Sequence, residues 1–350
     1  MVLFSSKNIY YYVFVFSMIL ASAYVGTRFN DAFKPQDEYE LIKNYLLNDS
    51  PLYGFNRPKI WIHTKYEYNA RRWKSFQSRS SYDLNQPYLH LTIKSIIDHC
   101  GDDFHICLID DNTFSKLIPS WEIDLSTVAE PMKTQLREVG MAELVYYYGG
   151  LVLPNSFLCL RHLRSFYDTG ISGNRPFVCE QINHSVQIGK QPHRYAFLPN
   201  TYILGAPKND PEVKELIVYL KRRNQTPHFS SDRDFLGDTS QWCMEAIAVQ
   251  KMNLVGGEWV GVKTNRKTPI LVDHLMEEQE LDIPENCVGI YIPEPEILSR
   301  KKYQWFAVYP TAELLETHMA ITKYMKQAVL DGSDQFYENP PSELKSVMSI

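Results

Sequence analysis

The sequence lacks the closely spaced cysteines that structural zinc sites use. Its six cysteines are far apart and no Cys-x-x-Cys pair occurs, so no zinc site is predicted. The chain also lacks an excess of basic charge, because 36 basic and 41 acidic residues give a net charge of -5. Without a stripe of basic and aromatic residues, nucleic acid is not an expected partner. Repeats and low-complexity blocks are absent too, and 350 residues suffice for one large domain or two small ones.

Charged residues are also absent from residues 8–27, which follow a short tail of residues 1–7. At about 1.5 Å per residue, this segment would span roughly 30 Å as a helix, the thickness of a bilayer core. Tyrosines near both ends are typical of a membrane interface. The segment is therefore predicted to be a transmembrane anchor. A cleaved signal peptide is the alternative, because Ala21-Ser22-Ala23 fits a cleavage site.

Three regions are predicted to follow this segment. Residues 28–56 are expected to form a polar stalk, residues 57–330 the main domain, and residues 331–350 a disordered tail. Because so few residues precede the apolar segment, the protein is predicted to cross a membrane once, with the large domain lumenal or external. Three glycosylation sequons agree with this placement, at Asn48, Asn183 and Asn224.

The main domain alternates between strand and helix patterns. Short apolar runs predict strands, and apolar residues at helical spacing predict helices. The first half is expected to contain strands at residues 60–64, 104–109 and 151–153 and helices at residues 88–99 and 134–148. The second half is expected to contain strands near 176–179, 202–204 and 288–292 and helices near 211–223, 240–251 and 311–330. This alternation predicts an α/β fold with a mostly parallel sheet and helices on both faces.

A helix pattern ends on Tyr148-Gly149-Gly150, and a short apolar strand follows at once. This order resembles glycosyltransferases of the DXD-containing GT-A type, nearest to the initiating mannosyltransferase and capsular polysaccharide synthesis groups. Residues 58–64 are similar to the first strand of the same families, and the resemblance covers residues 57–205. The whole chain also resembles an uncharacterised group of large-DNA-virus proteins.

The resemblance implies a GT-A-like, Rossmann-type sheet and a nucleotide sugar as donor, with a glycan or glycoprotein as acceptor. It also implies an acidic pair at the end of the apolar strand, where Pro154, Asn155 and Ser156 stand instead. Neutral oxygens hold Mg2+ or Mn2+ far less well than two carboxylates do, so no metal is predicted there. A metal site would need ligands displaced to Asp110 and Asp111.

The helix before this strand departs from the related families as well. In those families it carries a Ser-Asp pair and an arginine. The matching positions hold Arg137, Glu138 and Met141, so only the acid remains. A metal-free enzyme would need protein cations on the diphosphate. Arg137 and the pair Arg71 and Arg72 are the candidates, and a solvated basic loop is the alternative for the pair.

Ligands in an open α/β sheet bind outside the carboxyl ends of the strands. That rule selects six candidate ligand-binding residues, which are His63, Thr64, Asp110, Asp111, Asn155 and Ser156. It also selects Glu138 if the helix that carries it faces the cleft. For the two aspartates the alternative is a turn that caps the next helix. For His63 the alternative is a satisfied, partly buried histidine. Trp61 is expected in the core.

Two classes of function remain open. The first is a membrane-anchored glycosyltransferase without a conventional metal site, for which the sequence identifies no catalytic base. The second is a non-catalytic protein of the same fold that binds glycan or protein as a component of a membrane or a virion.

Overall fold

The computed structural model describes residues 57–64, 86–119, 121–183, 196–225 and 232–338. Several predictions concern residues outside these ranges, namely the tail 1–7, the apolar segment 8–27, the stalk 28–56, and the pair Arg71 and Arg72. Within the described ranges, no helix is both long and apolar enough to cross a bilayer.

A six-stranded sheet has the order β2-β1-β3-β6-β5-β7. Its strands are β1 (Lys59–His63), β2 (His105–Ile109), β3 (Gly150–Leu153), β5 (Phe177–Ile182), β6 (Phe197–Ala206) and β7 (Asn253–Val255). β1 pairs in parallel with β2 and β3, and β5 pairs in parallel with β7. β6 runs the opposite way, between β3 and β5. The prediction of a mostly parallel sheet is therefore confirmed.

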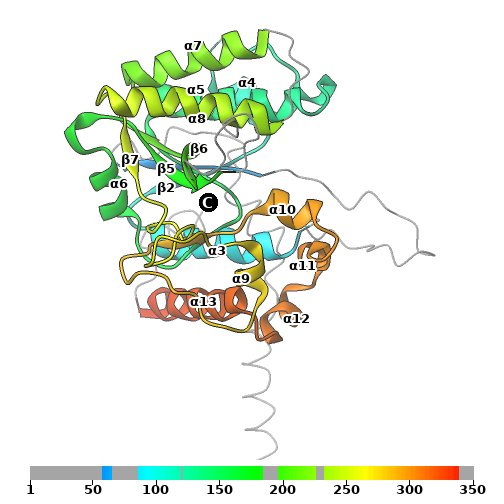
Figure 1. The fold of residues 1–350 in the computed structure, drawn as a ribbon. Coiled ribbons are helices and arrows are strands. Elements are labelled where there is room, and N and C mark those ends of the chain that lie inside the picture. The colour runs from blue at the N-terminus through cyan, green and yellow to red at the C-terminus, as the bar shows by residue number, and fades with distance from the viewer. Residues whose placement is uncertain (1–56, 65–85, 120, 184–195, 226–231, 339–350) are drawn as a thin grey trace, which may run out of the picture. The chain divides into compact units, whose positions relative to one another are not determined.

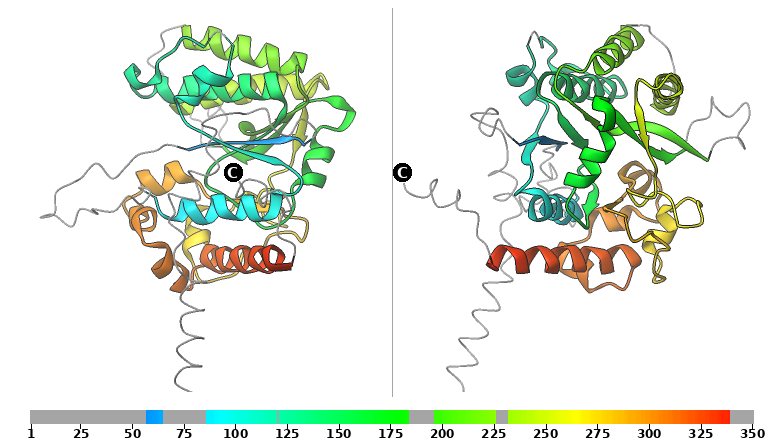
Figure 2. Two further views of the ribbon diagram at one scale, coloured as in Figure 1. Left: turned by 180° about the vertical axis from the view of Figure 1, so that it is seen from behind. Right: turned by 90° about the vertical axis from the view of Figure 1, so that its left-hand side faces the viewer.

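Helices cover both faces of this sheet (Figure 1 and Figure 2). One face carries α4 (Thr113–Leu117), α5 (Met132–Tyr148), α7 (Pro211–Gln225) and α8 (Asp232–Ala248). The other face carries α3 (Tyr88–Cys100), with α13 (Ala320–Glu338) packed beyond it. Side chains of a strand alternate between the faces. Trp61, Cys107 and Val152 accordingly share one buried core with residues of α5, α7 and α8, as expected for Trp61.

A second buried core lies between α3 and the C-terminal helices. It includes a two-stranded sheet of β4 (Phe157–Cys159) and β8 (Gly289–Tyr291). The short helices of this region are α9 (Val272–Met276), α10 (Glu294–Ser299), α11 (Gln304–Val308) and α12 (Thr311–Glu316). Leu91, Leu158, Ile290 and Phe306 are among the buried members. Because β4 follows β3 closely, the chain passes from the main sheet into this second core just after Pro154.

Several elements of the C-terminal half differ from the prediction, and β7 and the short helices α9, α10 and α11 were not predicted. The helix expected at 311–330 is two helices, because Thr317 is extended and its hydroxyl donates to the Leu314 carbonyl at 2.7 Å. α13 then continues to Glu338, into the predicted tail. α8 begins at Asp232, ahead of the expected start near residue 240.

The backbone conformation after Tyr148 explains why two glycines follow it. α5 ends at Tyr148, and Gly149 and Gly150 adopt φ angles of 70° and 108°, which residues with side chains disfavour. A Cβ atom on Gly150 would lie 2.2 Å from the carbonyl oxygen of Lys59. The glycines therefore let the chain turn from helix into strand and let β3 lie against β1.

Candidate functional site

The carboxyl ends of β1, β2, β3 and β5 lie at one edge of the sheet, because these strands share a direction. β1 leads to α3 on one face, whereas β2 leads to α4 and α5 on the other (Figure 1). The chain therefore leaves two neighbouring strands in opposite directions, the arrangement beside which α/β sheets bind ligands. We call this side of the sheet the carboxyl edge.

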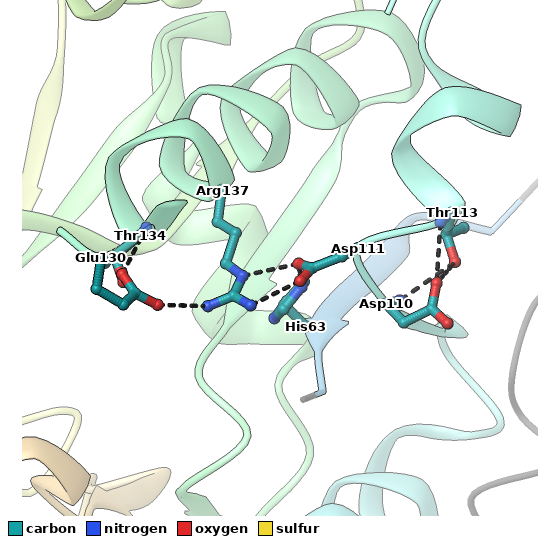
Figure 3. A network of polar contacts seen from close by, with 7 residues as sticks. All are labelled: His63, Asp110, Asp111, Thr113, Glu130, Thr134 and Arg137. Carbon is teal, nitrogen blue, oxygen red and sulfur yellow. Dashed lines mark hydrogen bonds and ion pairs between the residues drawn. The ribbon is translucent and has the colours of Figure 1, made fainter. Parts of the chain in front are cut away.

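Charged side chains meet at the carboxyl edge (Figure 3). Arg137 on α5 donates two hydrogen bonds to Asp111, from Nε to Oδ1 at 2.7 Å and from Nη2 to Oδ2 at 2.6 Å. Nε2 of His63, at the end of β1, lies 2.9 Å from Oδ1 of Asp111. Nη1 of Arg137 donates to Oε1 of Glu130 at 3.3 Å. We call these four residues the Asp111 network.

The charges of the Asp111 network compensate one another. Burial raises the pKa of Asp111, but hydrogen bonds from Arg137 and His63, together with their charges, outweigh burial and hold that pKa well below its usual value. The ionised carboxylate thus faces a guanidinium whose side chain is 12% exposed. The His63 ring stacks on Phe114, with centroids 5.7 Å apart. The structure therefore joins three residues that the sequence suggested separately.

Asp110 has a different role from its neighbour. Its Oδ1 accepts hydrogen bonds from the backbone N of Thr113 at 2.9 Å and from the Thr113 hydroxyl at 2.6 Å (Figure 3). It thus stabilises the first turn of α4, which was the alternative to ligand binding. Asp111 is bound to Arg137, so the two carboxylates do not fit a shared Mg2+ or Mn2+. Within the described ranges, no group of three His, Cys, Asp or Glu side chains is placed to hold a metal ion.

A bulge interrupts the pairing of β5 with β6 near the carboxyl edge. Val178 pairs with Leu204, but the next residue, Cys179, pairs with Asn200. Residues 201–203 are consequently left out of the ladder. Bulges of this kind re-aim side chains and are frequent beside functional sites.

Glu138 lies next to Arg137 on α5 and contacts this bulge. The Thr201 hydroxyl donates a short hydrogen bond to the Glu138 carboxyl. Burial raises the pKa of Glu138 to about 7, and the Thr201 bond offsets part of that rise. Near neutral pH the group is therefore divided between its protonated and ionised forms. Thr201 could not be identified from the sequence, because no local pattern marks the bulge.

Three further predicted residues among those described, Thr64, Asn155 and Ser156, also lie at the carboxyl edge. Thr64 is buried, and its Oγ1 has no hydrogen-bond partner among the described residues. Asn155 and Ser156 form the turn between β3 and β4, and they make contacts through their backbone oxygens. Asn155 O accepts from the Thr92 hydroxyl at 2.5 Å, and Ser156 O accepts from the backbone N of Ile292 at 3.1 Å. The turn is thus anchored to α3 and to the segment after β8.

A second charged cluster lies near the carboxyl edge. No sequence pattern predicts it, because its members come from separate segments. Glu180 on β5 forms an ion pair with Lys263 and accepts from the backbone N of Gly257 at 2.9 Å. Lys263 also lies 3.5 Å from a carboxylate oxygen of Glu258 and 4.6 Å from the ring centroid of Phe197. Like Arg137, this lysine is shared by two carboxylates.

No protein-family model matches this chain, and no curated protein matches it. Among solved structures, the chain is similar to one described as "PaToxG Glycosyltransferase". That match has 12% sequence identity and a TM-score of 0.33, and it covers 55% of this chain and 70% of the other. A likeness this remote assigns neither an activity nor a substrate.

Proposed function

We propose that residues 57–338 form a glycosyltransferase-like domain that binds an uncharged glycan or glycoprotein sugar at the carboxyl edge. In this proposal the domain does not transfer sugar from a metal-bound nucleotide. Three observations support it: the mostly parallel α/β sheet, the sequence resemblance over residues 57–205, and the neutral turn at Asn155 and Ser156 in place of an acidic pair.

The Asp111 network is the observation that carries this proposal. A nucleotide diphosphate is negatively charged, so its binding needs cations or a metal. Arg137 meets both carboxylate oxygens of Asp111 and also contacts Glu130. Lys263 is likewise paired with Glu180. Drawing either cation toward a phosphate would leave a partly buried carboxylate without its partner, which is strongly unfavourable. An uncharged ligand avoids that penalty.

A metal-independent glycosyltransferase is the second candidate, and Glu138 favours it. A carboxyl group with a pKa of about 7 suits a residue that transfers a proton at neutral pH. A nucleotide sugar would then be the donor, and a glycan or glycoprotein hydroxyl would give its proton to Glu138. Arg71 and Arg72 would meet the charge of the departing diphosphate.

A panel of glycans and nucleotide sugars separates the two candidates. The full-length protein is expected to bind at least one glycan equally well in EDTA and in Mn2+, and to leave UDP-, GDP- and CMP-sugars intact. Turnover of a donor that is lost in Glu138→Gln and in the Arg71→Ala, Arg72→Ala double variant would establish the enzyme instead. A folded protein with neither glycan binding nor turnover would contradict both candidates.

We also propose that residues 8–27 anchor the protein in a membrane as a single pass, with the domain lumenal or external. The support is the uncharged, apolar character of this segment. The protein should remain with membranes in alkaline carbonate, and its mature N-terminus should precede residue 10. A mature N-terminus at Tyr24 would instead establish a cleaved signal peptide.

A further inference from the structure

Three tyrosines from distant segments gather near the turn that follows β3. Tyr202 lies in the β6 bulge, and its ring centroid is 6.3 Å from that of Tyr291 at the end of β8. Tyr291 pairs with Phe157, the first residue after the turn. Tyr88, the first residue of α3, is buried in the same core as Ile290 and Ile292, the residues on either side of Tyr291. We call these three tyrosines, together with Gln86 and Glu294, the tyrosine cluster.

The tyrosine cluster contains buried polar atoms that have no hydrogen-bond partner. Tyr88 is fully buried, and its hydroxyl has no partner among the described residues. In the same part of the structure, Oε1 of Gln86 is buried and unpartnered, while Nε2 donates to Glu294 at 2.6 Å. Buried polar groups in native proteins are nearly always paired, and an unpaired group lowers stability. A ligand that supplies the missing bonds accounts for such groups.

The electrostatics of the tyrosine cluster select against anions. Burial, and then the charge of Glu294, raises the pKa of Tyr88 well above its usual value. Burial likewise raises the pKa of Tyr291, with Tyr202 and Glu294 contributing. Both hydroxyls therefore stay neutral and able to donate at physiological pH. The Glu294 carboxylate disfavours a phosphate or an acidic sugar, whereas aromatic faces suit the apolar face of a neutral sugar ring.

We infer that the tyrosine cluster is a binding subsite for an uncharged sugar ring. This inference rests on the proposed function and names the residues that hold its ligand. The Tyr88 hydroxyl and Oε1 of Gln86 exchange hydrogen bonds with sugar hydroxyls, and Glu294 accepts from a further one. The partly buried ring of Tyr202 lies against the apolar face of the sugar. The cluster thereby places the ligand beside the neutral turn at Asn155.

Tyr88→Phe tests the subsite most sharply, because it removes one oxygen and keeps the ring. Since this hydroxyl is unpartnered without ligand, the variant should melt at the wild-type temperature or about 2–4 °C above it. It should weaken sugar binding about three- to tenfold, the effect of one lost hydrogen bond. Tyr148→Phe is the matched control, because that hydroxyl donates to the Leu117 carbonyl at 2.7 Å. The control should melt lower and keep its sugar affinity.

The measurements are thermal melts and calorimetry of the full-length protein with methyl glycosides of glucose, mannose, galactose and N-acetylglucosamine. If wild type binds a probe and neither Tyr88→Phe nor Tyr202→Ala changes its affinity, the subsite is wrong and the proposed function stands. If wild type binds neither these probes nor the glycan panel, both are wrong. The protein could instead bind choline and no sugar, and lose choline binding in Tyr202→Ala. That result would show that the cluster binds a cation, and it would contradict the inferred sugar subsite.

Discussion

The Asp111 network and the tyrosine cluster lie at the same edge of the sheet, but they differ in how their polar atoms are paired. In the network, both oxygens of Asp111 accept hydrogen bonds from Arg137, and His63 adds a third contact. In the cluster, the Tyr88 hydroxyl is buried with no partner within the described ranges. Fully paired groups stabilise the fold, whereas a buried group without a partner gains a bond when a ligand arrives. The Asp111 network is therefore expected to stabilise the fold, and the tyrosine cluster is expected to bind the ligand.

Asp111→Ala should cause the largest loss of stability and so test the supporting role of the network. It leaves the Arg137 guanidinium, which is 12% exposed, without its bidentate partner. Because the pair is partly buried, the unfolding free energy should fall by about 2–4 kcal/mol. Chemical denaturation measures the change.

Asp168→Ala is the control for this prediction. Asp168 also pairs with an arginine, Arg164, at 2.9 Å, but the Arg164 side chain is 48% exposed. Solvent compensates for the loss of an exposed pair, so this variant should lose clearly less stability than Asp111→Ala. Equal losses would show that the Asp111 network has no special supporting role.

Glu138 should make the stability of the protein depend on pH. Its pKa is raised from 4.5 to about 7, so between these values the folded protein retains a proton that the unfolded chain releases. The contribution of Glu138 is therefore fully present below pH 4.5 and is lost as the pH rises to about 7, a change on the order of 3 kcal/mol.

Denaturation near pH 5 and near pH 7.5 measures this slope. Wild type should lose stability over that interval relative to Glu138→Gln, which has no proton to release. Asp111 does not interfere, because its lowered pKa places its own loss of stability at acidic pH, below the usual value of 3.8. Parallel pH profiles for wild type and Glu138→Gln would show that burial does not raise the Glu138 pKa.

Asp110→Ala should have the smallest effect and sharpen the contrast between two neighbouring aspartates. The variant loses the hydrogen bonds from Thr113 that stabilise the start of α4. A loss of about 1 kcal/mol is expected, as for other helix-capping residues. Glycan binding should not change. A change in glycan affinity without a change in stability would instead place Asp110 in the binding site.

Local patterns in the sequence were enough to predict the elements around the first three strands. The apolar runs of β1 and β2 and the helical spacing in α5 depend on nearby residues, and the glycines after Tyr148 marked the turn into β3. The break between α12 and α13 was missed, because it depends on the backbone at Thr317. Strand order and the antiparallel β6 depend on pairing across the whole chain, which no local pattern encodes.

The sequence indicated which residues end the strands, but not which side chains contact one another. The strand-end rule placed His63 and Asp111 at one edge, but it could not show that Arg137, on a different element, would take both oxygens of Asp111. The role of Arg137 at a diphosphate stays a prediction, and in the structure its guanidinium contacts the carboxylates of Asp111 and Glu130. The tyrosine cluster combines Gln86, which precedes α3, with residues of α3, β6, β8 and α10, so its members become neighbours only in the folded chain.

In the proposed function, the carboxyl edge neutralises its own charge and binds an uncharged ligand. Calorimetric titration of UDP-glucose and GDP-mannose with Mn2+ into the full-length protein tests it most directly, with Asp111→Asn as the companion variant. We expect no metal-dependent binding at micromolar concentrations for either protein. Micromolar, Mn2+-dependent binding by wild type that is lost in Asp111→Asn would contradict it, because Asp111 would then be a metal ligand and the domain a nucleotide-sugar enzyme.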